Sequence, residues 1–349
     1  MSPFLADVLE AGGKIGFIWA VVLAGLLPVL VWVERRGAGL IQDRPGPNRV
    51  GPFGLFQSVA DVIKFFMKED VTPTYADKLL YNLAPLLAMV PAITTFAVIP
   101  FGSSIVLFGR KIDLIIADVN IGVLYVFALT SLGVYGIVLA GWASNSKFAL
   151  MGGIRSSAQI ISYELAMGLS ATAVFLAAGS LRLTEVVTYQ QGEIFGFLPR
   201  WNCLPQFIGC AIFIVSAFAE TNRLPFDLAE AEAELVAGYH TEYSSAFKFA
   251  MFFMSEYANL VAASAMITTL YFGGWSFPFV HLTGVAGALF SMAVFAAKTG
   301  FFIWVFIWVR WTLPRFRYDQ LMALGWKVFL PVSLLNLLAV AALVSLKVL

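Results

Sequence analysis

The chain contains eight uncharged apolar stretches, each long enough to cross the hydrocarbon core of a membrane as a single helix. They cover residues 15–33, 79–101, 119–142, 156–180, 203–220, 249–272, 282–309 and 328–348. Because about 20 apolar residues in a helix span the roughly 30 Å of hydrocarbon, each stretch predicts one crossing. Hydrophobic residues make up 60% of the chain and charged residues 12%, which excludes an ordinary soluble domain. We therefore expect an all-α polytopic integral membrane protein with about eight transmembrane helices, forming a single membrane domain over residues 1–349.

Lysine and arginine are divided unevenly between the two sets of connections. Fifteen of the 22 lie in the first, third, fifth and seventh connections between the predicted helices. Since short loops rich in Lys and Arg stay on the cytoplasmic side, we expect both termini on the outer side of the membrane. Residues 1–14 include Asp7 and Glu10 and lack a basic n-region, so no cleaved signal peptide is expected.

Several function classes are excluded by composition and motifs. The net charge of +1 gives no basis for nucleic-acid binding through bulk electrostatics. Two cysteines, Cys203 and Cys210, with His240 and His281, are too few for a zinc or iron–sulfur site. The sequence also has no GxGxxG or Walker A motif, so we expect no nucleotide to bind to this chain.

The fifth connection, residues 220–248, concentrates acidic residues. Its carboxylates are Glu220, Asp227, Glu230, Glu232, Glu234 and Glu242. The spacing of Asp227, Glu230 and Glu234 predicts that they share one face of a helix. Carboxylates crowded into a partly dry site have raised pKa values, which suits a proton relay. The alternative is a solvated acidic surface that meets a basic partner.

Two further carboxylates favour the relay. Glu164 and Glu256 lie inside predicted spans, next to the span that Glu220 ends, and ionisable residues at membrane depth are costly unless they have a function. We therefore expect Glu220, Glu164 and Glu256 to form a line. Lys298 also lies within a span, where it either pairs with one of these carboxylates or extends toward the membrane surface.

The first connection, residues 34–78, combines a rigid segment with a surface helix. Glycine and proline recur over residues 45–54, which predicts a stiff path rich in turns. Apolar residues at helical spacing over 53–68 predict an amphipathic helix on the membrane surface. The helix either packs peripherally or forms part of a lateral mouth for a lipid-soluble substrate, with Asp61 and Lys64 partly neutralising each other.

Four segments carry a family resemblance. Residues 33–36, 46–52, 220–230 and 314–321 closely resemble the signatures of the quinone-channel membrane subunit of respiratory complex I. This family includes NADH dehydrogenase subunit 1 of mitochondria and the corresponding H-subunit of bacterial NADH-quinone oxidoreductase. The resemblance extends over roughly 31–175 and 205–349, and it implies nothing about the function of residues 1–14 and 181–204.

The resemblance implies a role in a proton-translocating NADH:quinone oxidoreductase. Ubiquinone or menaquinone would be the substrate, FMN and iron–sulfur clusters would lie in partner subunits, and this chain would bind no cofactor itself. With Glu256 added from its own position, the proton-transfer candidates are Glu164, Glu220, Asp227, Glu230, Glu232, Glu234, Glu242 and Glu256. With Lys64 added as the neighbour of Asp61, the tunnel candidates are Arg35, Arg36, Asp61, Lys64, Phe226 and Arg310.

The resemblance also implies the setting. The expected partners are hydrophilic redox-arm subunits, small membrane subunits, antiporter-like subunits and lipid. The expected location is a bacterial inner membrane, or the mitochondrial inner membrane. Three alternatives remain: the homologous subunit of a membrane-bound hydrogenase, an ion-coupled secondary transporter, and a passive membrane anchor. A transporter would usually show an internal repeat, and neither the acidic segment nor the Gly-Pro segment has a second copy.

Overall fold

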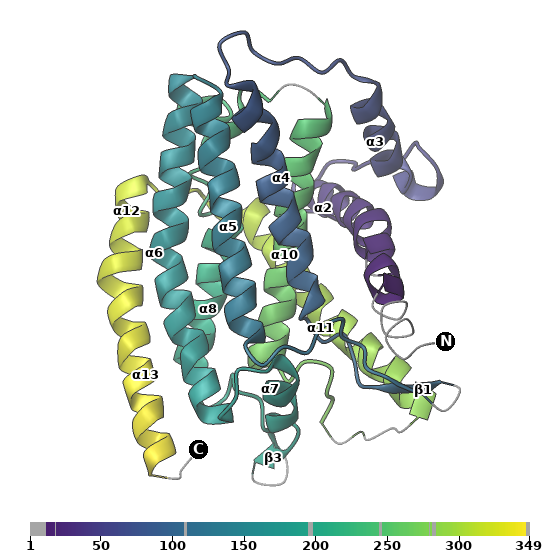
Figure 1. The fold of residues 1–349 in the computed structure, drawn as a ribbon, viewed down its shortest axis with the longest axis vertical. Helices are drawn as coiled ribbons and strands as arrows, with labels where there is room; N and C mark the ends of the chain where they lie inside the picture. The colour runs from purple at the N-terminus through teal and green to yellow at the C-terminus, as the bar shows by residue number, and fades with distance from the viewer. Residues whose placement is uncertain are drawn as a thin grey trace.

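Long helices dominate the computed structural model of the chain (Figure 1). The structure describes residues 12–17, 19–107, 110–194, 198–243, 246–278, 280 and 284–346. Within these residues, seven helices are long and apolar enough to cross a membrane: Gly12–Ile41, Lys78–Ala97, Gly122–Ala143, Lys147–Ala178, Phe247–Tyr271, Gly284–Thr312 and Tyr318–Ser345. A shorter apolar helix, Phe207–Glu220, corresponds to the one remaining predicted stretch, residues 203–220. The all-α membrane fold is thus confirmed.

The elements follow one another in this order. A π-helical turn, Ala20–Leu26, leads into α2 (Leu27–Ile41), followed by α3 (Gln57–Met67), α4 (Lys78–Thr94), a hairpin of β1 (Ile105–Leu107) and β2 (Arg110–Ile112), α5 (Gly122–Ala143), α6 (Lys147–Ala178), α7 (Leu183–Tyr189), a hairpin of β3 (Glu193–Ile194) and β4 (Leu198–Pro199), α8 (Phe207–Glu220), α9 (Glu232–Leu235), α10 (Ala246–Tyr271), α11 (Gly284–Thr312), α12 (Tyr318–Ala323) and α13 (Leu330–Ser345). A π-helical segment, Leu324–Phe329, joins α12 to α13.

The helices form a bundle with two distinct ends (Figure 1). Helices α4, α5, α6 and α10 run along the long axis, α13 flanks α6, and α2 leans away from the bundle beneath α3. The connections 42–77, 144–146 and 221–243 gather at the upper end, which we call the loop end. Helix α7 and both hairpins lie at the opposite end. The predicted connections rich in Lys and Arg therefore share one end of the molecule.

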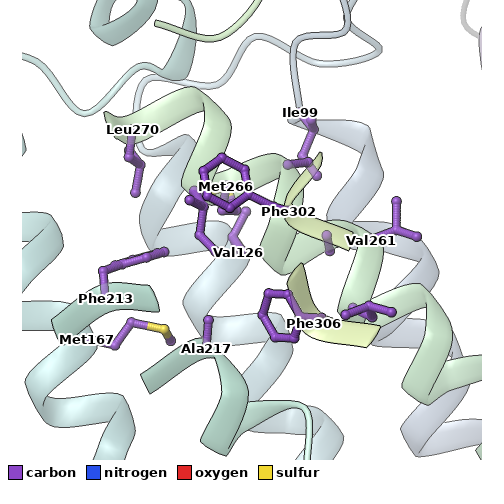
Figure 2. Close-up of a cluster of buried hydrophobic side chains, with 14 of the residues drawn as sticks. Ile99, Val126, Met167, Phe213, Ala217, Val261, Met266, Leu270, Phe302 and Phe306 are labelled. Atoms are coloured by element: carbon purple, nitrogen blue, oxygen red, sulfur yellow. The ribbon is translucent and has the colours of Figure 1, made fainter. Parts of the chain in front are cut away.

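Aromatic and aliphatic side chains fill the centre of the bundle. Figure 2 shows Phe213 and Ala217 of α8 beside Met266 of α10 and Phe302 and Phe306 of α11. The rings of Phe218 and Phe306 stack with their centroids 3.9 Å apart. This dense apolar packing leaves little room for charged side chains in the centre of the bundle.

Small residues allow the closest helix contacts. A Cβ on Gly136 of α5 would lie 2.7 Å from the backbone nitrogen of Ala88 in α4. Membrane helices pack through such small residues because lipid provides no hydrophobic force between them. Helix α4 also contains Pro85 and Pro91, as membrane helices tolerate.

Three spans extend further than the apolar stretches predicted. Helix α2 continues from residue 33 to Ile41, α6 begins at Lys147 instead of 156, and the last span begins at Tyr318 instead of 328. The predicted stretches stopped at the first charged residue. The helices continue because charges such as Glu34 and Arg155 have ionic partners in the folded chain.

The predicted amphipathic helix is confirmed as α3, but it begins at Gln57 and not at 53. Gly51 and Gly54 have φ angles of 73° and 77°, which an α-helix does not accommodate. The apolar side chains of Ile63, Phe66 and Met67 are exposed, as expected for a helix that lies on a membrane surface.

Candidate functional site

Four charged residues from four different segments meet inside the protein. Glu34 of α2, Arg223 after α8, Glu256 of α10 and Arg310 of α11 form what we call the buried charge cluster. Arg223 Nη1 lies 3.1 Å from Glu34 Oε2, and Arg223 Nε lies 3.0 Å from Glu256 Oε1. Arg310 Nη1 lies 2.7 Å from Glu34 Oε1 and 3.7 Å from Glu256 Oε1. Each acid thus contacts both bases, and the cluster is neutral overall.

Burial makes this arrangement unusual. The side chain of Arg223 is 0% exposed and that of Glu34 is 4% exposed. The guanidinium of Arg223 also lies over the ring of Tyr257, 4.6 Å from its centroid. Removing charges from water costs several kcal/mol per ion unless close partners compensate. A change of charge on any member therefore disturbs all the others.

A second ion pair is formed by residues that follow Arg223 and Arg310 closely in sequence. Arg315 Nη2 contacts Asp227 Oδ2 at 2.6 Å. Burial raises the pKa of Asp227, and the charge of Arg315 offsets part of this effect. Asp227 is therefore protonated more readily than an exposed aspartate.

A small cavity connects three of the predicted proton-transfer residues. Its volume is about 40 Å³, and its lining includes Glu220, Glu230, Glu256, Tyr239 and Asn259. A polar cavity of this size has room for water, which could bridge the carboxylates. The structure thus brings Glu220, Glu230 and Glu256 together, although they belong to three separate segments.

Glu230 also lies beside the only described histidine, with its Oε1 4.0 Å from Nδ1 of His240. Burial lowers the pKa of His240 to about 4. The imidazole is therefore neutral near neutral pH, and His240 does not neutralise Glu230 there.

Glu164 is a neighbour of Glu220 that does not line this cavity. The hydroxyl of Ser131 in α5 donates a hydrogen bond to its carboxylate, and the charge of Glu164 acts on Glu220. Glu164 also lines an open groove of about 910 Å³ that includes residues of α5, α6 and α13. Of the predicted line of Glu220, Glu164 and Glu256, Glu220 has each of the other two as a neighbour in the structure, so Glu220 and not Glu164 lies in the middle.

The prediction that Asp227, Glu230 and Glu234 share one helical face is wrong. The segment is helical only over Glu232–Leu235, and a left-handed residue, Ala231 with φ of 36°, precedes that turn. Asp227 points toward Arg315, whereas Glu234 is 53% exposed and lies 2.5 Å from Arg155. The side chain of Glu232 lies outside the described part of the chain.

The end of the acidic segment is tied to α4. The hydroxyl of Tyr81 donates to the backbone carbonyl of Glu242 at 2.9 Å, and Tyr243 donates to the carbonyl of Tyr81 at 3.0 Å. The rings of Tyr81 and Tyr243 stack with centroids 4.1 Å apart. Glu242 thus lies away from the cavity that holds Glu220, Glu230 and Glu256, whose described lining does not include it.

The glycine Gly152 of α6 allows the acidic segment to pack closely against this helix. A Cβ on Gly152 would lie 2.6 Å from the backbone nitrogen of Tyr239. This contact places residues 238–240 directly against the bundle and supports the wall of the cavity.

The predicted tunnel residues of the first connection join α2 to α3. Arg35 and Asp61 form an ion pair, and Lys64 Nζ lies 3.7 Å from Asp61 Oδ1, as expected from their spacing. Arg36 Nη1 donates to the carbonyl of Phe53 at 3.1 Å. These contacts fix the angle between the leaning helix α2 and the surface helix α3.

The two remaining tunnel candidates lie deeper. Phe226 is buried between the rings of Tyr163 and Phe316, at centroid distances of 5.4 and 5.5 Å. Arg310 belongs to the buried charge cluster. In the structure of this chain, Phe226 is a packing residue and Arg310 an ionic one.

Three residues of the site were missed by sequence reasoning: Glu34, Arg223 and Arg315. Glu34 follows directly on the first apolar stretch, and Arg223 is the sole base between Glu220 and Glu242. A lone base among six acids was the available signal for Arg223. In the described residues, no group of three or more His, Cys, Asp or Glu side chains is arranged to hold a metal ion.

Comparison with known proteins places the chain among relatives of full length. The NADH dehydrogenase family model matches residues 14–341. The NADH-quinone oxidoreductase H-subunit 1 of Geobacter metallireducens is 50% identical over 347 residues, covering 99% of this chain and 100% of the relative. The NADH-quinone oxidoreductase H-subunit of Salinibacter ruber is 51% identical over 343 residues, covering 96% of this chain and 95% of the relative. This chain therefore belongs to the family of NADH-quinone oxidoreductase H-subunits.

Proposed function

We propose that this chain is the membrane subunit that couples quinone reduction to proton movement in a NADH:quinone oxidoreductase. The names of its relatives support the reaction class. The observation that carries the coupling is the buried charge cluster of Glu34, Arg223, Glu256 and Arg310. Glu34 precedes the tunnel candidates Arg35 and Arg36 in α2, and Glu256 lines the cavity that holds Glu220. The cluster is therefore the contact between a quinone side and a proton side.

In the proposed mechanism, a change of charge on the quinone side alters the protonation of carboxylates on the proton side. Reduction of quinone to neutral quinol takes up two electrons and two protons, and groups near α2 that give up these protons would become more negative. Because the buried charge cluster is neutral only as a whole, a change of charge beside Glu34 shifts Arg223 and Arg310 relative to Glu34 and Glu256. Glu256 then exchanges protons with Glu220 and Glu230 through the shared cavity. A local charge change that biases a two-state element suffices for such coupling.

The quinone would enter between α2 and α3. Helix α2 leans away from the bundle, and α3 lies above it with exposed apolar side chains (Figure 1). The ion pair of Arg35 and Asp61 joins the two helices at this place, Lys64 lies beside Asp61 on α3, and Arg36 binds the carbonyl of Phe53 just before α3. A lipid-soluble substrate would reach the buried charge cluster by passing between these two helices, with Phe226 and Arg310 deeper along its path.

The proposed setting follows the same lines. Partner subunits of the redox arm, carrying FMN and iron–sulfur clusters, would meet the loop end, while small membrane and antiporter-like subunits would meet the bundle. The groove that holds Glu164 is a suitable exit toward such subunits. The loop end would face the cytoplasm, or the matrix in a mitochondrion, because it carries most of the basic residues.

Neutralising Glu220 tests the proton side. In the assembled complex reconstituted into vesicles, Glu220→Gln should reduce quinone-dependent turnover and proton pumping together by tenfold or more, since a positioned proton-transfer group contributes about 10²-fold or more. NADH oxidation with a quinone acceptor and acidification of the vesicle lumen are the two measurements. The matched control is Glu185→Gln, an exposed acid on α7 at the opposite end, which should change neither. Wild-type turnover and pumping in Glu220→Gln would rule out the relay.

Photolabelling tests the quinone side. A photoreactive quinone analogue bound to the assembled complex should label segments 34–70 or 220–243, because these residues surround the proposed path. Labelled peptides are identified by mass spectrometry, with excess natural quinone as the competitor. Labelling that competes with quinone but is confined to other subunits would place the tunnel outside this chain.

A further inference from the structure

Hydrogen bonds close the bundle at the end opposite the acidic segment. The last carbonyls of a helix have no partner within it and attract positive charge. In α10, the carbonyl of Thr269 accepts from Gln190 Nε2 at 2.9 Å, that of Leu270 from Asn202 Nδ2 at 2.8 Å, and that of Tyr271 from the backbone nitrogen of Cys203 at 3.0 Å. The C-terminus of α10 is therefore fully capped by side chains and backbone from the α7–α8 region.

Lys298 of α11 completes this closure. Its Nζ donates to the backbone carbonyls of Phe272 at 2.7 Å, Gly274 at 3.1 Å and Ser276 at 2.6 Å. An ammonium group has three protons, and each has one carbonyl. The same Nζ lies over the ring of Trp201, 4.7 Å from its centroid, which adds a cation–π contact. We call these four groups around Nζ the Lys298 cage.

Of the two alternatives for Lys298, pairing with a carboxylate is not what the structure has, because its partners among the described residues are three carbonyls and an aromatic ring. Carbonyls and a ring face stabilise the charged form of lysine and provide no group that accepts its proton. The cage therefore holds the ammonium group in place and offers it no group to which a proton could pass.

The Lys298 cage is separated from the proposed proton route by apolar packing. Tyr271 lies 15 residues after Glu256 on α10, about 22 Å along the helix axis. Between them lie Met266 and Leu270, which pack near Phe302 of α11 (Figure 2). The buried hydroxyls of Ser264, Thr268 and Thr269 on this stretch donate to carbonyls of α10 itself. An apolar core followed by a positive charge is an arrangement that excludes protons from a pathway.

We propose that Lys298 and its cage are the barrier that prevents protons from leaking between the opposite end of the molecule and the carboxylates Glu256 and Glu220. The inference rests on the proposed proton function of these carboxylates. Without Lys298, the carbonyls of Phe272, Gly274 and Ser276 would lack this donor and would attract hydrated protons, and the ammonium of Lys298 occupies that place. Proton uptake is then restricted to the loop end.

Passive leak through the assembled complex tests this barrier. The complex is reconstituted into vesicles, a proton gradient is imposed without NADH or quinone, and its decay is followed with a fluorescent pH indicator. Lys298→Gln keeps two donors but removes the charge, so the gradient should decay several-fold faster than with the unmodified complex. Lys298→Arg keeps the charge and should decay as slowly as the unmodified complex. Lys327→Gln, an exposed lysine on another span, is the matched control and should have no effect.

The outcomes separate this barrier from the proposed function. A normal decay rate in assembled Lys298→Gln would overturn the barrier. If Lys298→Gln does not assemble, Lys298→Arg decides, since fast decay with the charge retained would equally overturn it. Neither leak measurement needs quinone turnover. The proposal for the Lys298 cage can therefore be overturned while the effect of Glu220→Gln on pumping stands, and the effect of Glu220→Gln can be absent while the leak results stand.

Discussion

In the described structure, Arg223 combines complete burial of a charged side chain with close ionic partners. Its side chain is fully buried, lies between Glu34 and Glu256, and faces the ring of Tyr257. Removing one partner of a buried ion pair leaves an uncompensated charge and typically costs about 3–5 kcal/mol. Arg223→Met should therefore sharply lower the amount of assembled complex and its thermal stability, measured by native gel electrophoresis and thermal inactivation.

A double variant tests whether the loss comes from the uncompensated charge. Adding Glu34→Gln removes one acid together with the base, so the pair of substitutions should be less damaging than the sum of the two alone. Arg317→Met is the control, because among the described residues this exposed arginine forms its ion pair with the exposed Asp319, and the variant should leave assembly unchanged. A strictly additive double variant would show that Arg223 does not act through Glu34.

At the scale of elements, apolar runs predicted which helices exist but not where the charged helices end. Helix α2 continues past Glu34 because Arg223 and Arg310, distant in sequence, neutralise that carboxylate. No local pattern contains this information. The amphipathic pattern predicted α3 well, since its signal is the spacing of its own side chains.

The acidic segment shows the opposite case. Helical spacing of Asp227, Glu230 and Glu234 suggested one face, but these residues turn in different directions toward Arg315, the cavity and Arg155. Their partners come from three other segments, so tertiary contacts outweigh the local propensity for a helix. The residues of the candidate site could thus be named largely from sequence and resemblance, whereas their grouping into a cluster and a cavity required the fold.

For the whole molecule, the decisive question is which end faces which side of the membrane. The connections rich in Lys and Arg gather at the loop end, and the Lys298 cage closes the opposite end (Figure 1). If proton uptake is restricted to the loop end, that end must face the cytoplasm or matrix. The orientation predicted from charge and the proposed barrier therefore depend on each other.

Accessibility of single cysteines tests this orientation. With Cys203 and Cys210 replaced by serine, Lys68→Cys at the end of α3 and Glu185→Cys on α7 place one thiol of this chain at each end of the molecule, both at exposed positions. A membrane-impermeant maleimide should label Glu185→Cys in right-side-out vesicles and Lys68→Cys in inside-out vesicles, with the labelled peptide identified by mass spectrometry. The charge bias gives this direction, because moving the basic connections across the membrane is unfavourable. The reverse labelling pattern would place the acidic segment on the outer side of the membrane. Protons taken up from the cytoplasm would then have to cross the Lys298 cage, which contradicts its proposed role as a barrier.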